Sequence, residues 1–442
     1  MVEFDRFPVG GNGHLQIGGC DSVELAREFG TPLYVLDEAR VRTACRQYRE
    51  EFQHRYADTE VSYAGKALLC QALCALVESE GLGLDVASEG ELHTALGASF
   101  APGRITAHGN YKREAYLRRC LEAGVGHIVV DSLPELTALS ALADDMGCEA
   151  AILIRVAPGI KTQTHTFIQT GQEDSKFGLG IASGDALAAV RRAAELPGLR
   201  LRGIHCHIGS QLFGLDSFRR TVEVMTEFLA EARAACPTAA EVLNLGGGLG
   251  IRYTHEDAPP TVAELAAAIA KSLVACLDQH GLGRPTLMLE PGRSIVGPAG
   301  VTLYTIGVVK EIPGVRTYVS VDGGLSDNPR PCMYGAEYEA TIANKAGRPR
   351  QIPVRVSGSH CETDTLIRDV PVQAPEQGDV LAVFATGAYN YAMASNYNRF
   401  PRPAMVLVHD GEAEVIVARE TMEDLVRQDR IPARLQRGHV PA

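Results

Sequence analysis

Short apolar runs alternate with longer amphipathic stretches along much of the chain, from about Pro32 to Glu290. The longer stretches carry apolar side chains at helical spacing, most clearly over residues 67–80, which end before Gly81, and over residues 215–236. The short runs predict strands, at TPLYVLD, EVSYAG, LGLDVAS, RITAHG, HIVVDS, AAILIRVA, LRGIHCHIG, EVLNLGG and TLMLEPG. Repeated strand–helix units predict parallel strands with right-handed crossovers. About eight units in roughly 250 residues favour a closed (β/α)8 barrel, with an open doubly wound sheet as the alternative.

The pattern changes after about residue 300. Segments such as VTLYTIGVVKEI, TYVSVDGG, RQIPVRVSG, GDVLAVFATGAY and PAMVLVHDG are β-rich and separated by Gly, Pro or Asp turns. HDGEAE, at residues 409–414, is typical of a β-hairpin. The sequence therefore predicts a second, mainly β domain after the barrel.

Composition and charge narrow the class of protein. The 442 residues are 45% hydrophobic and 22% charged, which is ordinary for a soluble globular protein. A net charge of −12 argues against a general nucleic-acid binder, which needs a basic surface. We expect no membrane span and no secretory signal, because the chain has no long uncharged apolar run and no basic start followed by one. The 11 cysteines form no Cys-x-x-Cys pair, which favours reduced thiols in a cytoplasm over a disulfide framework.

Lys66 follows the predicted strand EVSYAG directly and precedes a predicted helix. Active sites of (β/α)8 barrels lie at the carboxyl ends of the strands, so a lysine at this point can reach the site. An amine in a low-dielectric cavity can form a Schiff base with a carbonyl compound. Taken alone, a solvated loop lysine is the more common explanation.

Two further motifs follow predicted barrel strands. Asn244-Leu-Gly-Gly-Gly-Leu-Gly250 can bring successive N–H groups close to an anion, although a tight strand-to-helix turn explains it about as well. His205 and His207 would share one face of a strand. A metal pair is possible, but the spacing shows no third ligand. A flat imidazole over a flat ring, with the Ser210 hydroxyl donating to a phosphate, is the sharper alternative.

The last two candidate motifs each contain a carboxylate. Glu290-Pro-Gly-Arg293 ends the last predicted barrel strand, where a buried carboxylate could keep a pyridine nitrogen protonated and Arg293 could bind an anion. His360-Cys-Glu-Thr-Asp364 lies in the β-domain. Its cysteine could donate a proton, and a buried structural thiol is the simpler interpretation of Cys361 alone.

Together these motifs resemble the fold type III pyridoxal-phosphate (PLP) decarboxylases, and within them the branch that acts on meso-2,6-diaminopimelate. The resemblance runs over nearly the whole chain and includes YAGKA, LDVASEGEL, HCHIGSQ, LNLGGGLGI, EPGRSIVGPAG, DGGLSDNPRPCMYGAEYEA, HCETD and TGAYNYAMASNYN. It implies a PLP-binding (β/α)8 barrel followed by a β-domain of the alanine-racemase kind that also recruits the N-terminus. We therefore expect the barrel at 33–285 and the β-domain at 1–32 and 286–442.

The resemblance also implies roles for single residues. It implies cofactor contacts at Lys66, His207, Ser210, Gly247, Gly248, Glu290, Gly292, Arg293 and Tyr389. It implies substrate contacts at Arg293, Arg330, Tyr334, Glu362 and Tyr389. Lys66 would carry PLP as a Schiff base, His207 would stack on its ring and Glu290 would face the pyridine nitrogen. Cys361 would be the proton donor and, with Glu362, would enter the active site from the other subunit, so a homodimer is implied. No metal is expected.

The implied reaction is the loss of CO2 from the substrate, with PLP as the electron sink and a final protonation by Cys361. With meso-2,6-diaminopimelate the product is L-lysine, in the last step of lysine biosynthesis. Arg330 and Tyr334 supply bidentate and hydroxyl partners that suit the second carboxylate of this substrate. The family more often has Cys-Glu-Ser-Gly-Asp where this chain has Cys361-Glu-Thr-Asp-Thr.

Three alternatives remain at the level of the sequence. The first is a related decarboxylase that acts on a basic amino acid or a carboxypolyamine. The second is an inactive homologue with a regulatory role, against which the intact Lys66 and Cys361 argue. The third, a metal hydrolase, is weak because no triad of ligands has suitable spacing.

Overall fold

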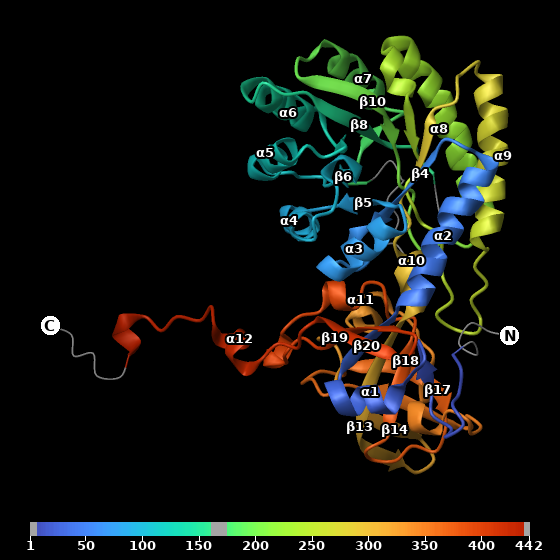
Figure 1. Ribbon diagram of the computed structural model, residues 1–442, viewed down its shortest axis with the longest axis vertical. Helices are drawn as coiled ribbons and strands as arrows, with labels where there is room; N and C mark the ends of the chain where they lie inside the picture. The colour runs from blue at the N-terminus through green and yellow to red at the C-terminus, as the bar shows by residue number, and fades with distance from the viewer. Residues whose placement is uncertain (1–6, 161–174, 437–442) are drawn as a thin grey trace.

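The computed structural model describes residues 7–160 and 175–436, and its upper part in Figure 1 is a closed barrel of parallel strands. Strand β4 pairs with β12 on one side and β5 on the other, and the ring closes where β8 pairs with β10. The barrel strands are β4 (Thr59–Ala64), β5 (Gly83–Val86), β6 (Ile105–Ala107), β7 (His127–Val130), β8 (Ala150–Ala157), β10 (Leu199–His205), β11 (Val242–Asn244) and β12 (Thr286–Leu289). The predicted (β/α)8 barrel is confirmed and the open sheet is excluded.

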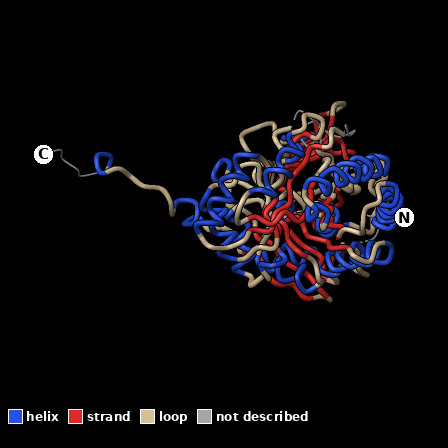
Figure 2. The backbone as a smooth tube through the Cα atoms, turned by 90° about the horizontal axis from the view of Figure 1, so that it is seen from above, coloured by secondary structure: helices blue, strands red, loops and turns tan. Residues whose placement is uncertain are grey.

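Helices surround these strands, as the view from above shows (Figure 2). They are α2 (Glu38–Arg55), α3 (Gln71–Ser79), α4 (Glu89–Gly97), α5 (Glu114–Ala123), α6 (Leu133–Asp145), α7 (Asp185–Glu195), α8 (Leu215–Ala235) and α9 (Val262–Gln279). Several begin at side-chain caps that the sequence encodes. Ser88 caps α4, Ser132 caps α6, and Thr261 forms a reciprocal capping box with Glu264 at the start of α9.

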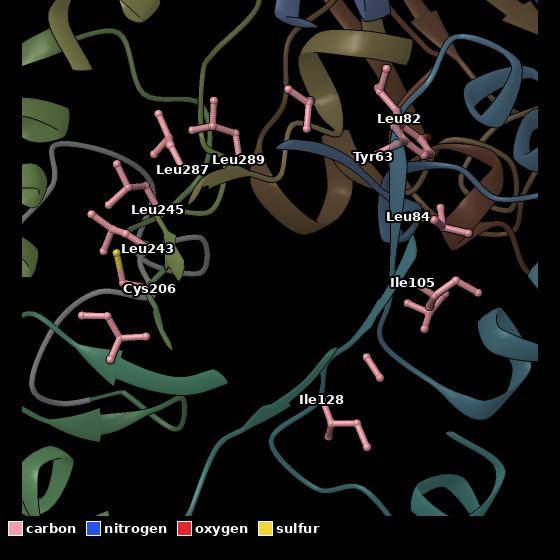
Figure 3. Packing of buried hydrophobic residues seen from close by; sticks show 14 of the residues in the cluster. Tyr63, Leu82, Leu84, Ile105, Ile128, Cys206, Leu243, Leu245, Leu287 and Leu289 are labelled. Carbon is pink, nitrogen blue, oxygen red and sulfur yellow. The ribbon is translucent and has the colours of Figure 1, made fainter. Parts of the chain in front are cut away.

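Side chains alternate between the two faces of each barrel strand. The outward ones, such as Tyr63, Leu84 and Ile105, belong to the large apolar layer between strands and helices (Figure 3). The inward ones near the barrel floor form a small separate cluster of Val129, Leu153, Val242 and Met288. Both faces of the strands are therefore buried, as a parallel sheet requires.

The lower part of the molecule in Figure 1 is the mainly β domain. Its main sheet has the order β17-β16-β14-β13-β3-β19-β20, and β18 joins β13 to β15. Its strands are β3 (Leu33–Asp37), β13 (Gly300–Ile312), β14 (Arg316–Val321), β15 (Ala340–Ile342), β16 (Ile352–Ser357), β17 (Thr365–Val372), β18 (Val380–Phe384), β19 (Ala404–His409) and β20 (Glu412–Val417). The N-terminal β1 (Gln16–Ile17), β2 (Cys20–Asp21) and α1 (Ser22–Phe29) precede β3. The smaller elements are β9 (Leu179–Gly180), which pairs with the end of β8, α10 (Arg293–Val296), α11 (Arg330–Tyr334) and α12 (Met422–Val426).

The expected domain limits of 33–285 and 286–442 each misplace one strand. Strand β3 pairs with β13 and β19 in the β-domain, although the limit at residue 33 assigned it to the barrel. Strand β12 pairs with β11 and β4 and so belongs to the barrel, beyond the limit at 285. All five residues of β3 are buried, a pattern that fits a central strand of either sheet.

The local predictions held to different degrees. Helix α8 agrees with the predicted 215–236 to within one residue, and β19 and β20 form the predicted hairpin through Asp410 and Gly411, both at positive φ. The predicted helix over 67–80 is shorter, because Gly65–Ala67 form a 3-10 turn, Leu68 and Cys70 are extended, and the helix begins at Gln71. Within residues 7–160 and 175–436, we find no helix of the length and apolarity that crossing a membrane requires.

Candidate active site

A cavity of about 570 Å³ lies where the carboxyl ends of the barrel strands meet the β-domain. Eight of the predicted site residues line it: Lys66, His207, Ser210, Glu290, Arg293, Arg330, Tyr334 and Tyr389. The lining also includes Asp85, His108, Arg155, His205 and Tyr253, to which the sequence interpretation gave no role in the site, except that His205 was considered for a metal pair. The predicted Gly247, Gly248 and Gly292 lie in the surrounding backbone, and Cys361 and Glu362 are not part of the lining.

Lys66 reaches the cavity from a short 3-10 turn, Gly65–Ala67, at the end of β4. The turn is fixed on both sides, because the Ala64 N–H donates to Pro291 O at 3.0 Å and the Tyr389 N–H donates to Ala67 O at 2.8 Å. A side chain at Gly65 would come within 2.8 Å of Asp85 O, so glycine permits this close approach. The surrounding backbone thus presents the amine while its side chain remains exposed to the cavity.

Glu290 is a buried carboxylate with three partners. Asn244 Nδ2 donates to its Oε1 at 2.6 Å, and His205 Nε2 lies 3.0 Å from its Oε2. His108 Nε2 lies 3.2 Å from Oε1. Burial alone would raise the pKa of Glu290, but His205 and His108 hold it well below its ordinary value. Because burial lowers the pKa of His205 to about 4, its neutral ring donates to a carboxylate that stays ionised.

The same three residues resemble a ligand set. His108, His205 and Glu290 each offer one ligand atom, and these atoms lie within 4.8 Å of one another, as a metal site would require. The sequence indicated only the pair His205 and His207 and no third ligand. The fold supplies His108 and Glu290 from other strands, which spacing along the chain could not reveal.

Asp85 is the most unusual carboxyl in the cavity. It is buried, and neither of its oxygens has a hydrogen-bond partner among the described residues. Burial raises its pKa well above the ordinary value, and the nearby Glu290 adds to this, while Lys66 opposes it. A buried carboxyl of this kind can bind a cationic or hydrogen-bonding group that enters the cavity.

Two buried arginines share an aromatic partner. Arg293 donates from Nε and Nη2 to Ser210 Oγ at 3.2 and 2.8 Å, and from Nη1 to Tyr253 Oη at 2.6 Å. The guanidinium of Arg330 lies 4.7 Å from the centre of the Tyr253 ring, and its Nη1 donates to Tyr338 Oη at 2.6 Å. Both guanidinium groups are thereby held at the cavity wall in a fixed geometry, suited to bidentate binding of anions.

The glycine-rich segment 244–250 passes close to Glu290 and His207. A side chain at Gly247 would lie 2.2 Å from Glu290 O, and Gly248 has a φ of 123°, which favours glycine. The Gly247 N–H donates to His207 Nδ1 at 3.3 Å. The motif therefore allows two backbone segments to approach each other closely beside the cavity.

Cys361 and Glu362 lie outside this cavity and are exposed. The Cys361 N–H donates to Asn398 Oδ1 at 2.9 Å, and Tyr397 Oη donates to Glu362 Oε1 at 2.7 Å. The neighbouring Asp364 accepts from the ring of His360 at 2.7 Å. The interpretation of Cys361 as a buried thiol is wrong, because this cysteine is exposed.

Comparison with known proteins agrees with this geometry. Residues 38–297 match the family described as pyridoxal-dependent decarboxylase, pyridoxal binding domain. The diaminopimelate decarboxylase of Bacillus subtilis (strain 168) is 46% identical over 419 residues, with 95% of each chain covered. That of Mycobacterium tuberculosis (strain ATCC 25618 / H37Rv) is 44% identical over 420 residues, with 93% of each chain covered.

Solved structures give the same result. Diaminopimelate decarboxylase from M. jannaschii in co-complex with L-lysine superposes with a TM-score of 0.92 at 36% identity, over 99% of this chain and 100% of that one. A lysine/ornithine decarboxylase from Vibrio vulnificus shares the fold, with a TM-score of 0.73 at 24% identity over 88% and 98% of the two chains.

Proposed function

The chain belongs to the pyridoxal-dependent decarboxylases, in the branch of the diaminopimelate decarboxylases, and we propose that it converts meso-2,6-diaminopimelate to L-lysine and CO2. The observation that carries this proposal is the composition of one cavity. It joins the Lys66 amine, the ionised Glu290 and the two arginines Arg293 and Arg330. This set provides a covalent anchor, a counter-charge for a cationic ring, and partners for several anionic groups.

The cavity fits pyridoxal phosphate on its own geometry. Lys66 supplies the amine that holds such an aldehyde, and the carboxylate of Glu290 supports a proton on a ring nitrogen. Ser210 and the backbone at Gly247, Gly248 and Gly292 would surround the phosphate with Arg293 and Tyr389, and His207 would stack on the ring. The unpartnered oxygens of Asp85 are consistent with an additional polar or cationic group in the cavity.

When bound, pyridoxal phosphate supplies a protonated ring that accepts the electron pair released as CO2 departs. The protein's own residues then decide the outcome. The ionised Glu290, fixed by Asn244 and His205, holds the ring proton in place at neutral pH. The Lys66 amine would hold the cofactor covalently between turnovers.

Substrate selection rests on Arg293, Arg330 and Tyr334, with polar contacts from Glu362 and Tyr389. Diaminopimelate carries one more carboxylate than ornithine or lysine, and a buried arginine left without its anion penalises a substrate that lacks it. Arg330 is 7% exposed, so that penalty is not relieved by solvent.

Cys361 donates the proton that replaces CO2 at the substrate carbon, and it does so from a second copy of the chain. Its exposure, with that of Glu362, and their absence from the lining of their own cavity support this arrangement. The working enzyme is therefore a homodimer in which each copy completes the other's site. All 11 cysteines are free thiols, which supports a reducing compartment, the cytoplasm.

The test is the release of CO2 from a panel of amino acids by purified, PLP-supplied protein. We expect meso-diaminopimelate to react with a higher kcat/KM than L-lysine, L-ornithine or L-arginine. A higher kcat/KM with L-ornithine or L-lysine would assign the protein to a related decarboxylase. The absence of both CO2 release and an absorbance band near the visible edge would sink the enzyme proposal. Dialysis against a chelator should leave the activity unchanged, because we expect His108 and His205 to contact Glu290 in place of a metal ion.

A further inference from the structure

The last described part of the chain forms an arm that leaves the body of the molecule. Residues 421–436 begin with α12 and end with a 3-10 turn at Ala433–Leu435. Figures 1 and 2 show this arm from two directions, and in both it runs outward, away from the barrel and the β-domain. We call residues 421–436 the C-terminal arm.

The C-terminal arm carries a series of uncovered apolar side chains. Met422 is 65% exposed, Val426 55%, Ile431 66% and Leu435 64%. A five-residue helix is too short to be stable in water by itself, because helix nucleation is costly and neighbouring packing normally compensates for it. Apolar side chains concentrated on one short segment are typical of a surface that another molecule covers.

The base of the arm is held firmly, so its direction is defined. Glu420 accepts hydrogen bonds from Arg402 Nε at 2.8 Å and from Asn396 Nδ2 at 2.6 Å. Farther along, Arg399 donates to Leu425 O and, through Nη2, to Asp429 Oδ2 at 2.8 Å. The arm is thereby tied to the segment 396–399 as far as Asp429.

The same segment, 396–399, holds the loop that carries Cys361 and Glu362. Asn398 accepts from the Cys361 N–H, and Tyr397 donates to Glu362. The proposed function requires this loop to face the cavity of a second copy. The C-terminal arm therefore leaves the protein from a surface that already faces that second copy.

Charge and apolar surface point to the same partner. The arm has three acidic residues and three basic ones: Glu423, Asp424, Asp429, Arg427, Arg430 and Arg434. Such a balance gives no attraction to nucleic acid or to an anionic membrane. A second copy offers exposed apolar side chains of its own, among them Tyr111, Phe213 and Met333, which are 79%, 38% and 50% exposed.

We propose that the C-terminal arm packs through Ile431 and Leu435 onto a second copy of this chain and strengthens the dimer. The inference rests on the dimer of the proposed function, but it adds an element outside the active site. Each dimer would contain two such contacts, one from each arm.

The test is a concentration series in sedimentation velocity with the full-length protein. The variant I431D/L435D places two charges on the apolar side chains of the arm. The matched control Q428D/Q436D adds the same charge to the same arm and keeps both apolar side chains. We expect the dimer dissociation constant to rise at least tenfold in I431D/L435D and to stay within about twofold of the wild type in the control. A chain that ends at Asp429 should weaken the dimer as I431D/L435D does.

Three other outcomes would contradict the proposal, each for a different reason. A dimeric wild type with equal dissociation constants in I431D/L435D would overturn the role of the arm and leave the shared active site standing. Equal weakening in the control would show that charge, and no apolar contact, matters. A wild type that stays monomeric over the whole series would overturn both the arm contact and the proposed dimer.

Discussion

Tyr253 lies between the two buried arginines of the cavity, so replacing it with Phe tests whether this hydroxyl positions them for substrate. Its oxygen accepts a hydrogen bond from Arg293 Nη1 at 2.6 Å, and its ring packs against the guanidinium of Arg330. The Tyr253→Phe variant keeps the ring and removes only the acceptor. Arg293 would retain Ser210 through Nε and Nη2 and lose the one contact that fixes Nη1.

The magnitude follows from the burial and charge of this contact. Arg293 is 6% exposed, so water does not readily replace the missing oxygen. A buried hydrogen bond to a charged group contributes about 1.5–3 kcal/mol, or roughly 10- to 150-fold in an equilibrium constant. If Arg293 binds a substrate carboxylate equally in the ground state and the transition state, the loss appears in KM, and kcat changes by less than about threefold.

The assay is steady-state CO2 release from meso-diaminopimelate, with Tyr56→Phe as the matched control. Tyr56 is also buried and donates one hydrogen bond, to Pro285 O at 2.7 Å, but it is not part of the cavity. We expect a raised KM in Tyr253→Phe and an unchanged KM in Tyr56→Phe.

Burial alone would raise the pKa of Tyr253, but Arg293 and Arg330 draw it below its ordinary value. A phenolate formed at alkaline pH weakens both arginines for an anion, so the variant should shift the alkaline rise of KM to higher pH. An unchanged KM in Tyr253→Phe, or equal changes in both variants, would refute this reasoning.

Three other predictions follow from the described contacts. Glu290→Gln removes the counter-charge of the ring and should lower kcat on the order of a hundredfold or more while the protein still binds PLP; a near-normal kcat would contradict the role of Glu290. Lys66→Ala and Cys361→Ser should each be inactive, but an equal mixture should regain about a quarter of wild-type activity if each site combines both copies, and none if it does not. Burial raises the pKa of Asp327 from 3.8 to about 7. The folded state then keeps a proton that the unfolded chain has lost, so stability falls as the pH rises from about 4 to 7. Asp327→Asn should remove this slope, roughly 2 kcal/mol between pH 5 and 7 in urea titrations followed by circular dichroism, whereas parallel pH curves would contradict it.

Much of the barrel could be predicted because hydrophobic residues recur with different spacings in strands and in helices. The expected domain limit at residue 33 was wrong for β3. All residues of this strand are buried, and an apolar run does not encode which of two sheets it joins. Helix 67–80 was predicted too long for a related reason. The backbone around Lys66 follows contacts with Pro291 and Tyr389, which lie far away in the sequence.

The site could be predicted where residues directly follow strands. Lys66 and Glu290 come together because the carboxyl ends of parallel strands meet at one end of a barrel. The same signal marks His108, which directly follows β6, whereas Asp85 lies within β5, as a charged residue in an otherwise apolar strand. Tyr253 does not directly follow a predicted strand. Its contact with the cavity depends on the path of its loop, which the sequence pattern does not show. Cys361 is a different case, since its proposed partner lies on another copy of the chain.

The apolar floor of the barrel and the active site above it both depend on how side chains alternate between the two faces of each strand. A polar residue lies two positions after each residue of the small floor cluster. It is on the same face of the strand, at the carboxyl end. Val129 is followed by Asp131, Leu153 by Arg155, Val242 by Asn244 and Met288 by Glu290. These polar residues support one another: Asn244 donates to Glu290, and Arg155 lies 3.7 Å from Asp131. A shift of one residue in any strand would turn its polar group into the apolar layer beneath the helices, where a charge without partners costs several kcal/mol. The register that packs the core is therefore the register that assembles the site, and selection for either one maintains the other.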